Sequence, residues 1–77
     1  MTAVDFALRG DHITLDALLK ATGQAGSGGA AKVLIAEGGV RVNGAPEMRR
    51  GRKLRSGDQV ETGVGEGETR VRIHAET

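Results

Sequence analysis

The feature that most limits the fold of this chain is a short alternating segment that closes in a tight turn. Residues 40–44 read Val-Arg-Val-Asn-Gly, a period of two that is typical of a strand with one buried face. The Asn-Gly pair is the strongest short-range signal for a β-hairpin, because both residues accept a positive φ. Residues 28–37 directly before it have helical spacing, with Ser27 as a candidate N-cap. The sequence therefore predicts a helix that leads straight into a hairpin.

Apolar spacing predicts the other elements. An N-terminal strand is expected at residues 4–8, a first helix at residues 14–23, and two further strands at residues 59–62 and 69–74. The side chains expected to face the core are Val4, Phe6, Leu8, Leu15, Leu18, Leu19, Ala30, Ala31, Leu34, Ile35, Val71 and Ile73. The order β-α-α-β-β-β predicts an α+β fold, in which two helices pack on a small, mostly antiparallel sheet.

Composition narrows the function classes. The chain has 77 residues and no cysteine, so we expect one domain over residues 1–77 without a disulfide or a thiolate metal site. No secretory signal and no membrane-spanning apolar run is visible, which favours a cytoplasmic protein that does not bind membranes. Phe6 is the only aromatic residue, which counts against modules that bind single strands by stacking bases.

Charge is segregated along the chain. Residues 32–55 carry seven cations and two acids, a net charge of +5, whereas the rest carries four cations and eight acids, a net charge of −4. The basic segment, residues 49–55, has five cations and no acid. We therefore expect its cations to be exposed, and to form a surface for a polyanion such as RNA.

The ordered motifs carry a resemblance to a known family. Residues 27–44 read Ser-Gly-Gly-Ala-Ala-Lys-Val-Leu-Ile-Ala-Glu-Gly-Gly-Val-Arg-Val-Asn-Gly, and the basic segment follows and ends in Ser-Gly-Asp at residues 56–58. This pattern resembles the RNA-binding domain named after ribosomal protein S-four, over about residues 13–62. The short form with an added N-terminal strand is similar to the small, free-standing bacterial YbcJ-like group.

The resemblance implies a two-helix-plus-hairpin unit, the alpha-L RNA-binding motif, whose second helix and following loop contact structured RNA, often ribosomal or transfer RNA. Carried over position by position, the implied RNA-binding residues are Lys32, Arg41, Asn43, Gly44, Arg49, Arg50, Arg52, Lys53 and Arg55. Many family members have Ser-Arg where this chain has Ser27-Gly28, which shifts the expected phosphate contacts towards the loop.

No enzyme signature stands out. The glycines before Lys32 lack the Gly-Lys-Ser/Thr ending of a phosphate-binding loop, and His12 and His74 alone make a poor metal site. We therefore expect no catalytic residues, metal, cofactor or small-molecule substrate. The resemblance implies a ribosome-associated RNA-binding protein, and we expect it to be a monomer. The alternative function is a protein-interaction module that docks its basic loop on an acidic partner.

Overall fold

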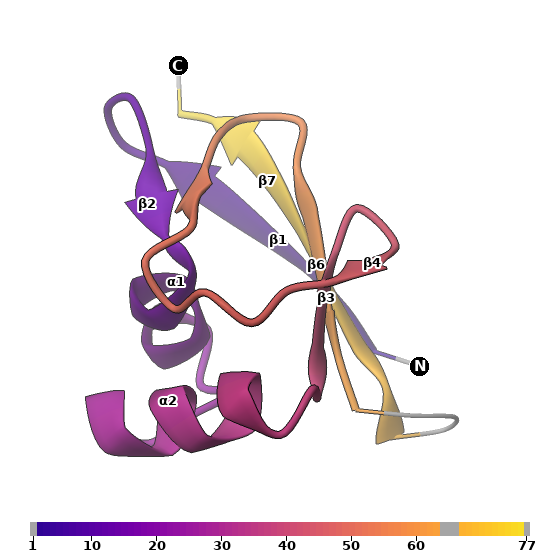
Figure 1. The fold of residues 1–77 in the computed structure, drawn as a ribbon. Coiled ribbons are helices and arrows are strands. Elements are labelled where there is room, and N and C mark those ends of the chain that lie inside the picture. Colours follow the sequence, from indigo (N-terminus) through magenta and orange to yellow (C-terminus); the bar gives the residue numbers. More distant parts are fainter. Residues whose placement is uncertain (1, 64–66, 77) are drawn as a thin grey trace.

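The computed structural model describes residues 2–63 and 67–76, and the ends of the predicted 1–77 domain lie outside these ranges. Two helices lie on one face of a five-stranded sheet, so the molecule has two layers (Figure 1). The elements are β1 (Thr2–Leu8), β2 (Ile13–Thr14), α1 (Leu15–Ala21), α2 (Gly28–Ala36), β3 (Val40–Val42), β4 (Ala45–Pro46), β5 (Lys53–Leu54), β6 (Gln59–Thr62) and β7 (Thr69–Ala75). The predicted α+β class is confirmed.

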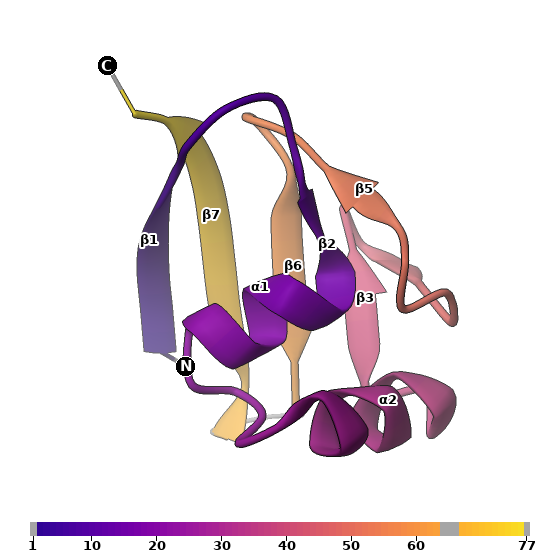
Figure 2. The ribbon, with the colours of Figure 1, turned by 90° about the vertical axis from the view of Figure 1, so that its left-hand side faces the viewer.

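The large sheet has the strand order β1-β7-β6-β3-β4. Strands β7, β6, β3 and β4 are antiparallel neighbours, whereas β1 pairs with β7 in parallel. Helix α1 crosses in front of this sheet and α2 lies near its lower end (Figure 2). The prediction of a mostly antiparallel sheet is therefore confirmed, and the one parallel pair joins the two ends of the chain.

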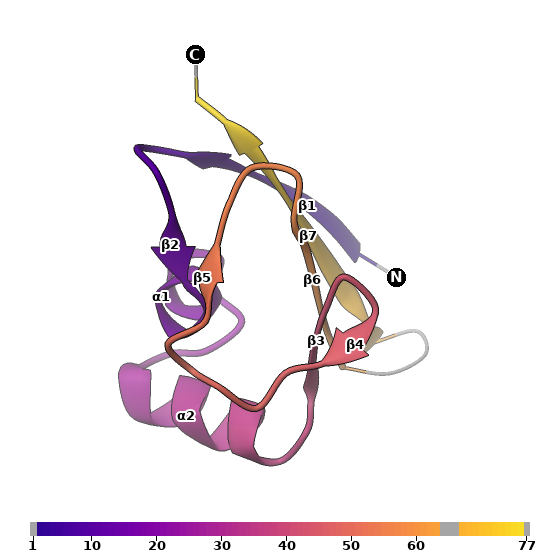
Figure 3. The ribbon, with the colours of Figure 1, turned by 45° about the horizontal axis from the view of Figure 1, so that its top comes forward.

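Three short strands were missed by sequence reasoning. Strand β4 is the two-residue return of the predicted hairpin, and β2 and β5 form a separate antiparallel pair with Ile13 opposite Leu54. This small pair lies on the helix side and faces the large sheet (Figure 3). A two-residue strand is too short to show a period of two, so only the folded chain reveals it.

The hairpin turn forms where it was predicted. Asn43 has a φ of 53° and Gly44 a φ of 85°, the two positive values that a type I′ turn requires. Asn43 is the only non-glycine residue with a positive φ in the described part of the chain. The Asn-Gly pair therefore fixes the register of β3 against β4.

Both helices begin as predicted, but by different hydrogen bonds. The Ser27 hydroxyl accepts a hydrogen bond of 3.1 Å from the backbone N–H of Ala30, which makes it the expected cap of α2. Thr14 occupies the cap position of α1, but its hydroxyl donates to Asp16 Oδ1 at 2.7 Å and caps no backbone amide. The backbone N–H of Ala17 donates to Asp16 Oδ1 at 2.9 Å, and the first two amides of α1 find their partners in the basic segment.

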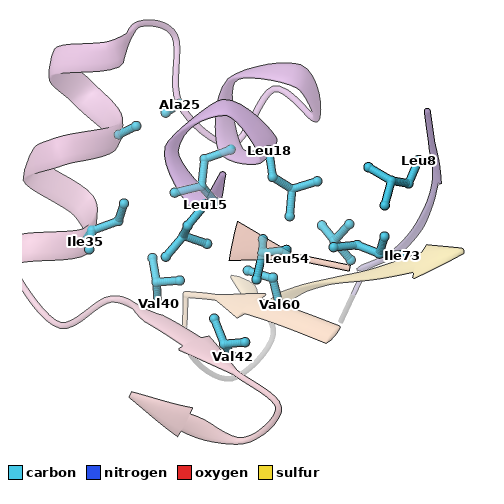
Figure 4. Packing of buried hydrophobic residues seen from close by; sticks show 13 residues of the cluster. Leu8, Leu15, Leu18, Ala25, Ile35, Val40, Val42, Leu54, Val60 and Ile73 are labelled. Atoms are coloured by element: carbon cyan, nitrogen blue, oxygen red, sulfur yellow. The ribbon is translucent and has the colours of Figure 1, made fainter. Parts of the chain in front are cut away.

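The core lies between the helices and the two sheets. Figure 4 shows Leu54 from the small sheet among side chains of α1, β3 and β6. On α2, Ala31 and Ile35 are buried and Leu34 is half-buried, but Ala30 is exposed, so its prediction as an inward residue is wrong. The helix turns the Ala31–Ile35 side towards α1 and the sheet, which leaves Ala30 at the rim.

None of the helices in residues 2–63 and 67–76 has the length and apolar character that crossing a membrane would require.

Truncation of Ile35 tests the helix register. Ile35 is 1% exposed, so Ile35→Ala should lower the free energy of unfolding by about 2–5 kcal/mol through lost burial and a cavity. Val33 is 54% exposed on the same helix, so Val33→Ala should change stability by less than about 0.5 kcal/mol. Urea unfolding of both variants measures this difference, and equal losses would contradict the register.

Candidate nucleic-acid interface

The basic segment is held against the start of helix α1 by its own backbone. The N–H of Leu15 donates to the carbonyl of Arg52 at 2.9 Å, and the N–H of Asp16 donates to the carbonyl of Arg50 at 3.1 Å. These two amides belong to the first turn of α1, where no intrahelical carbonyl is available to them. The basic loop therefore serves as the missing cap of α1, and its backbone is fixed at two points.

A buried side chain also anchors this segment. Leu54 is fully buried, and its neighbours Lys53 and Arg55 are exposed. Because successive side chains of an extended segment point to opposite sides, burial of Leu54 directs both cations to solvent. The apolar residue thus gives the charged side chains on either side of it a defined direction.

Glu47 is the most enclosed charged group near the loop, with its side chain only 8% exposed. Its carboxylate accepts hydrogen bonds from the backbone N–H of Arg49 at 3.1 Å, from Arg49 Nε at 3.1 Å and Nη2 at 3.3 Å, and from Arg52 Nη1 at 2.8 Å. The Arg49 and Arg52 guanidinium groups and the Arg49 amide lower the pKa of Glu47 to about 2. The expectation that the cations of the basic segment are exposed is confirmed for Arg49 but wrong for Arg52, which is half-buried beside Glu47.

Asp58 closes the other end of the loop. Its Oδ2 accepts from the backbone N–H of Arg55 at 2.8 Å, and its Oδ1 accepts from Asn43 Nδ2 at 3.0 Å. Asn43 Oδ1 in turn accepts from the backbone N–H of Gln59 at 2.9 Å. Burial of Asp58 opposes its ionisation, but these donors and the nearby charges of Arg52 and Arg55 outweigh it and lower its pKa. The Asn-Gly turn and the Gly-Asp turn are therefore joined directly by side chains.

Four predicted cations remain available for a ligand. Lys32, Arg50, Lys53 and Arg55 are exposed and form no ion pair with another described residue. Lys53 lies on β5, Arg55 directly follows it, Arg50 lies in the loop before it, and Lys32 lies on α2. The segment between β4 and β5 passes beside α2 in all three ribbon views (Figures 1, 2 and 3). We call these four residues the open cations.

Arg41 lies in a different place from the loop. It sits between the buried residues Val40 and Val42, so its side chain belongs to the sheet face that points away from the helices. There its guanidinium pairs with Glu68 at 3.1 Å and lies 3.9 Å from Glu61. The structure thus separates Arg41 from the open cations, and its contact with RNA stays a prediction.

Other groups of the predicted site act on the turn itself. Both hydrogen-bonding atoms of the Asn43 side chain are occupied by Asp58 and Gln59, and Gly44 supplies the positive φ of the turn. A direct contact of these two residues with RNA also stays a prediction. Sequence reasoning did not identify the loop-holding roles of Glu47 and Asp58. A signal for Glu47 was present, because it is an acid placed two residues before an arginine and five before another.

The rest of the described chain offers few competing sites. Two shallow hollows occur, one beside Phe6, Leu8 and Ile13 and one beside Gln24, Val33 and Leu34. Within residues 2–63 and 67–76 no three histidine, aspartate or glutamate side chains come together as metal ligands would. The exposed cations of the basic segment are therefore the strongest candidate binding site in the described chain, and their charge suits a polyanion.

The Glu47 contacts predict a pH dependence of stability. Because its pKa falls from about 4.5 to about 2 on folding, ionised Glu47 stabilises the native state above pH 4.5. That contribution should disappear as the pH falls from 4.5 to 2. Glu47→Gln should therefore be less stable than wild type at pH 7, and the difference should shrink towards pH 2. Urea unfolding at several pH values measures it.

Glu37 provides the matched control, because it is exposed and forms no ion pair with another described residue. Glu37→Gln removes the same charge and should show a smaller, flatter difference from wild type across this pH range. A pH-independent difference for Glu47→Gln would contradict the assignment of the buried carboxylate.

Comparison with known proteins gives this site a family. Over 49 residues the chain is 47% identical to "Putative RNA-binding protein YbcJ" of Escherichia coli (strain K12), covering 64% of this chain and 70% of that protein. Over 51 residues it is 51% identical to "Probable ribosome maturation protein RlbA" of Bacillus subtilis (strain 168), covering 66% and 72%. The family model described as the S4 domain matches residues 6–72, which include both helices and the basic loop. The chain belongs to the S4 domain family, the S-four type that its motifs resemble.

Proposed function

We propose that this protein binds structured RNA, without catalysis, through α2 and the basic segment, residues 49–55. The observation that carries the proposal is the group of open cations, Lys32, Arg50, Lys53 and Arg55, none of which forms an ion pair with another described residue. Three of them project from a backbone that is tied to α1, so their positions along the loop are set before a ligand arrives. A loop with a fixed backbone binds phosphates with a smaller loss of loop freedom.

The mode of binding follows from what the surface contains. Phe6 is the only aromatic residue of the chain, and it packs against the core from β1. A platform for base stacking is therefore missing, and phosphate and sugar contacts must supply the affinity. Arginine is suited to this, since its planar group offers two parallel donors to a phosphate. Such a surface favours the regular phosphate spacing of a folded RNA.

The names of the two relatives, taken together, lead us to propose ribosomal RNA as the ligand. One relative is named as a ribosome maturation protein and the other as an RNA-binding protein. We propose the same association for this chain, as a cytoplasmic monomer that contacts ribosomal RNA. The match of the S4 domain model across the basic segment supports the RNA binding, and the name of the Bacillus subtilis relative supports the ribosomal association.

Removal of open cations tests where RNA binds. The double variant Arg50→Gln/Arg55→Gln should weaken binding to an RNA hairpin by about tenfold, with a salt slope shallower by about two units. The melting temperature should stay within a few degrees, because neither side chain is buried or ion-paired in the described structure. Fluorescence anisotropy at several salt concentrations measures both quantities.

A charge-matched control separates the loop from general electrostatics. Lys20 and Arg72 are exposed at other places, on α1 and on the outer face of the sheet. The double variant Lys20→Gln/Arg72→Gln has the same net charge as the loop variant, but should bind within about twofold of wild type. Equal losses in both variants would reject the loop as the RNA-binding surface.

The form of the preferred ligand is tested with four probes. A ribosomal RNA hairpin should bind more tightly than its unstructured scramble, a DNA duplex of the same length or polyglutamate. The logarithm of affinity for the hairpin should fall with the logarithm of salt concentration at a slope of about −3 to −5, as expected for four to six neutralised phosphates. A preference for the unstructured strand would contradict this mode, and a preference for polyglutamate would favour an acidic protein partner.

A further inference from the structure

Glu47 is an acidic residue next to the basic segment, where a negative charge should weaken the binding of a polyanion. It lies between the hairpin and the basic segment, and its carboxylate receives four hydrogen bonds from Arg49 and Arg52. Its own backbone N–H donates to the carbonyl of Val40 at 3.0 Å, which ties it to strand β3. Glu47 is therefore fixed to the sheet and holds two arginines of the loop.

Neither affinity nor stability alone explains a carboxylate at this position. For affinity, each acid near the loop lowers the local positive potential that attracts phosphates. For stability, the pair gains less than its hydrogen bonds suggest, because the enclosed Glu47 carboxylate must lose water while Arg49 stays largely exposed and screened. What an ion pair supplies and an apolar contact does not is a defined orientation of the guanidinium groups.

The contacts divide the cations of the basic segment into two classes. Arg49 and Arg52 are held by Glu47, while Arg50, Lys53 and Arg55 are unpaired within the described structure. The Arg49 side chain is nevertheless 76% exposed, and only its Nε and Nη2 donate to Glu47, which leaves Nη1 available to a ligand. Arg49 is thus an exposed donor whose direction is fixed and whose charge is partly neutralised.

We propose that Glu47 is a positioning residue that makes the RNA-binding loop selective, by holding Arg49 and Arg52 in one arrangement at the expense of general attraction to polyanions. This inference rests on the proposed RNA binding. A held guanidinium meets a phosphate only where the RNA backbone has the matching shape, whereas a mobile one follows any polyanion. Removal of the carboxylate would release the guanidinium groups of Arg49 and Arg52. The loop would then bind polyanions in general more tightly and discriminate less between RNA shapes.

The test is the Glu47→Gln variant, studied at pH 7 with a ribosomal RNA hairpin and its unstructured scramble. Binding to the scramble should become tighter, and its salt slope should steepen by about one unit, because one opposing charge is lost. The ratio of hairpin affinity to scramble affinity should fall by about fivefold or more, the effect of about one lost positioned contact. A residue with only a structural role would weaken both complexes together.

Glu37→Gln is the control, since Glu37 is exposed, carries the same charge and holds no cation in the described structure. It should leave the ratio unchanged. An unchanged ratio in folded Glu47→Gln would overturn the proposal. If wild type binds neither RNA, the proposed function itself fails, so the two failures are distinguishable.

A second variant covers the case in which Glu47→Gln does not fold. Arg49→Lys/Arg52→Lys keeps every charge but replaces the planar forks with ammonium groups, which cannot be held in one orientation by two parallel hydrogen bonds. The salt slope should stay within about half a unit of wild type, while the affinity ratio should again fall by about fivefold. An unchanged ratio in this variant would likewise overturn the proposal.

Discussion

The structure depends on the burial of one leucine within a run of cations. Leu54 is fully enclosed between the helices and the large sheet, and the pairing of β5 with β2 continues from it (Figures 3 and 4). Burial of such a side chain is worth about 1.5–3 kcal/mol, more than the mutual repulsion of exposed charges in salt solution. Without this anchor, nothing apolar would hold the basic segment against the protein.

That anchor connects folding with the binding surface. When Leu54 enters the core, the carbonyls of Arg50 and Arg52 come within reach of the first amides of α1. The helix gains a cap and the loop gains a fixed backbone, so each stabilises the other. The backbone that carries the open cations of the basic segment is therefore held in place by the packing of the core, as a preorganised site requires.

Ion pairs neutralise the arginines on the outer face of the sheet more completely than those of the basic segment. On the face away from the helices, Arg41 and Arg70 pair with Glu61 and Glu68 across neighbouring strands. Near the loop, Glu47 offsets two arginines and leaves three cations of the basic segment unpaired among the described residues. Most of the cations without an ion pair in the described chain therefore lie in the basic segment or on α2, which explains how a chain with a net charge of +1 could bind a polyanion.

The sequence by itself determined the two helices, the Asn-Gly turn, the α+β class and the location of the basic segment, because each depends on neighbours within a few residues. It did not determine that Ala30 is exposed, that β2 pairs with β5, or that Arg49 and Arg52 are held by Glu47. The rotation of α2 depends on what packs against it, and a two-residue strand exists only through its partner. The division of the cations into held and open groups depends on which side chain the folded backbone brings to each guanidinium. Local patterns therefore fixed where the charge lies, and tertiary packing alone decided how that charge is presented.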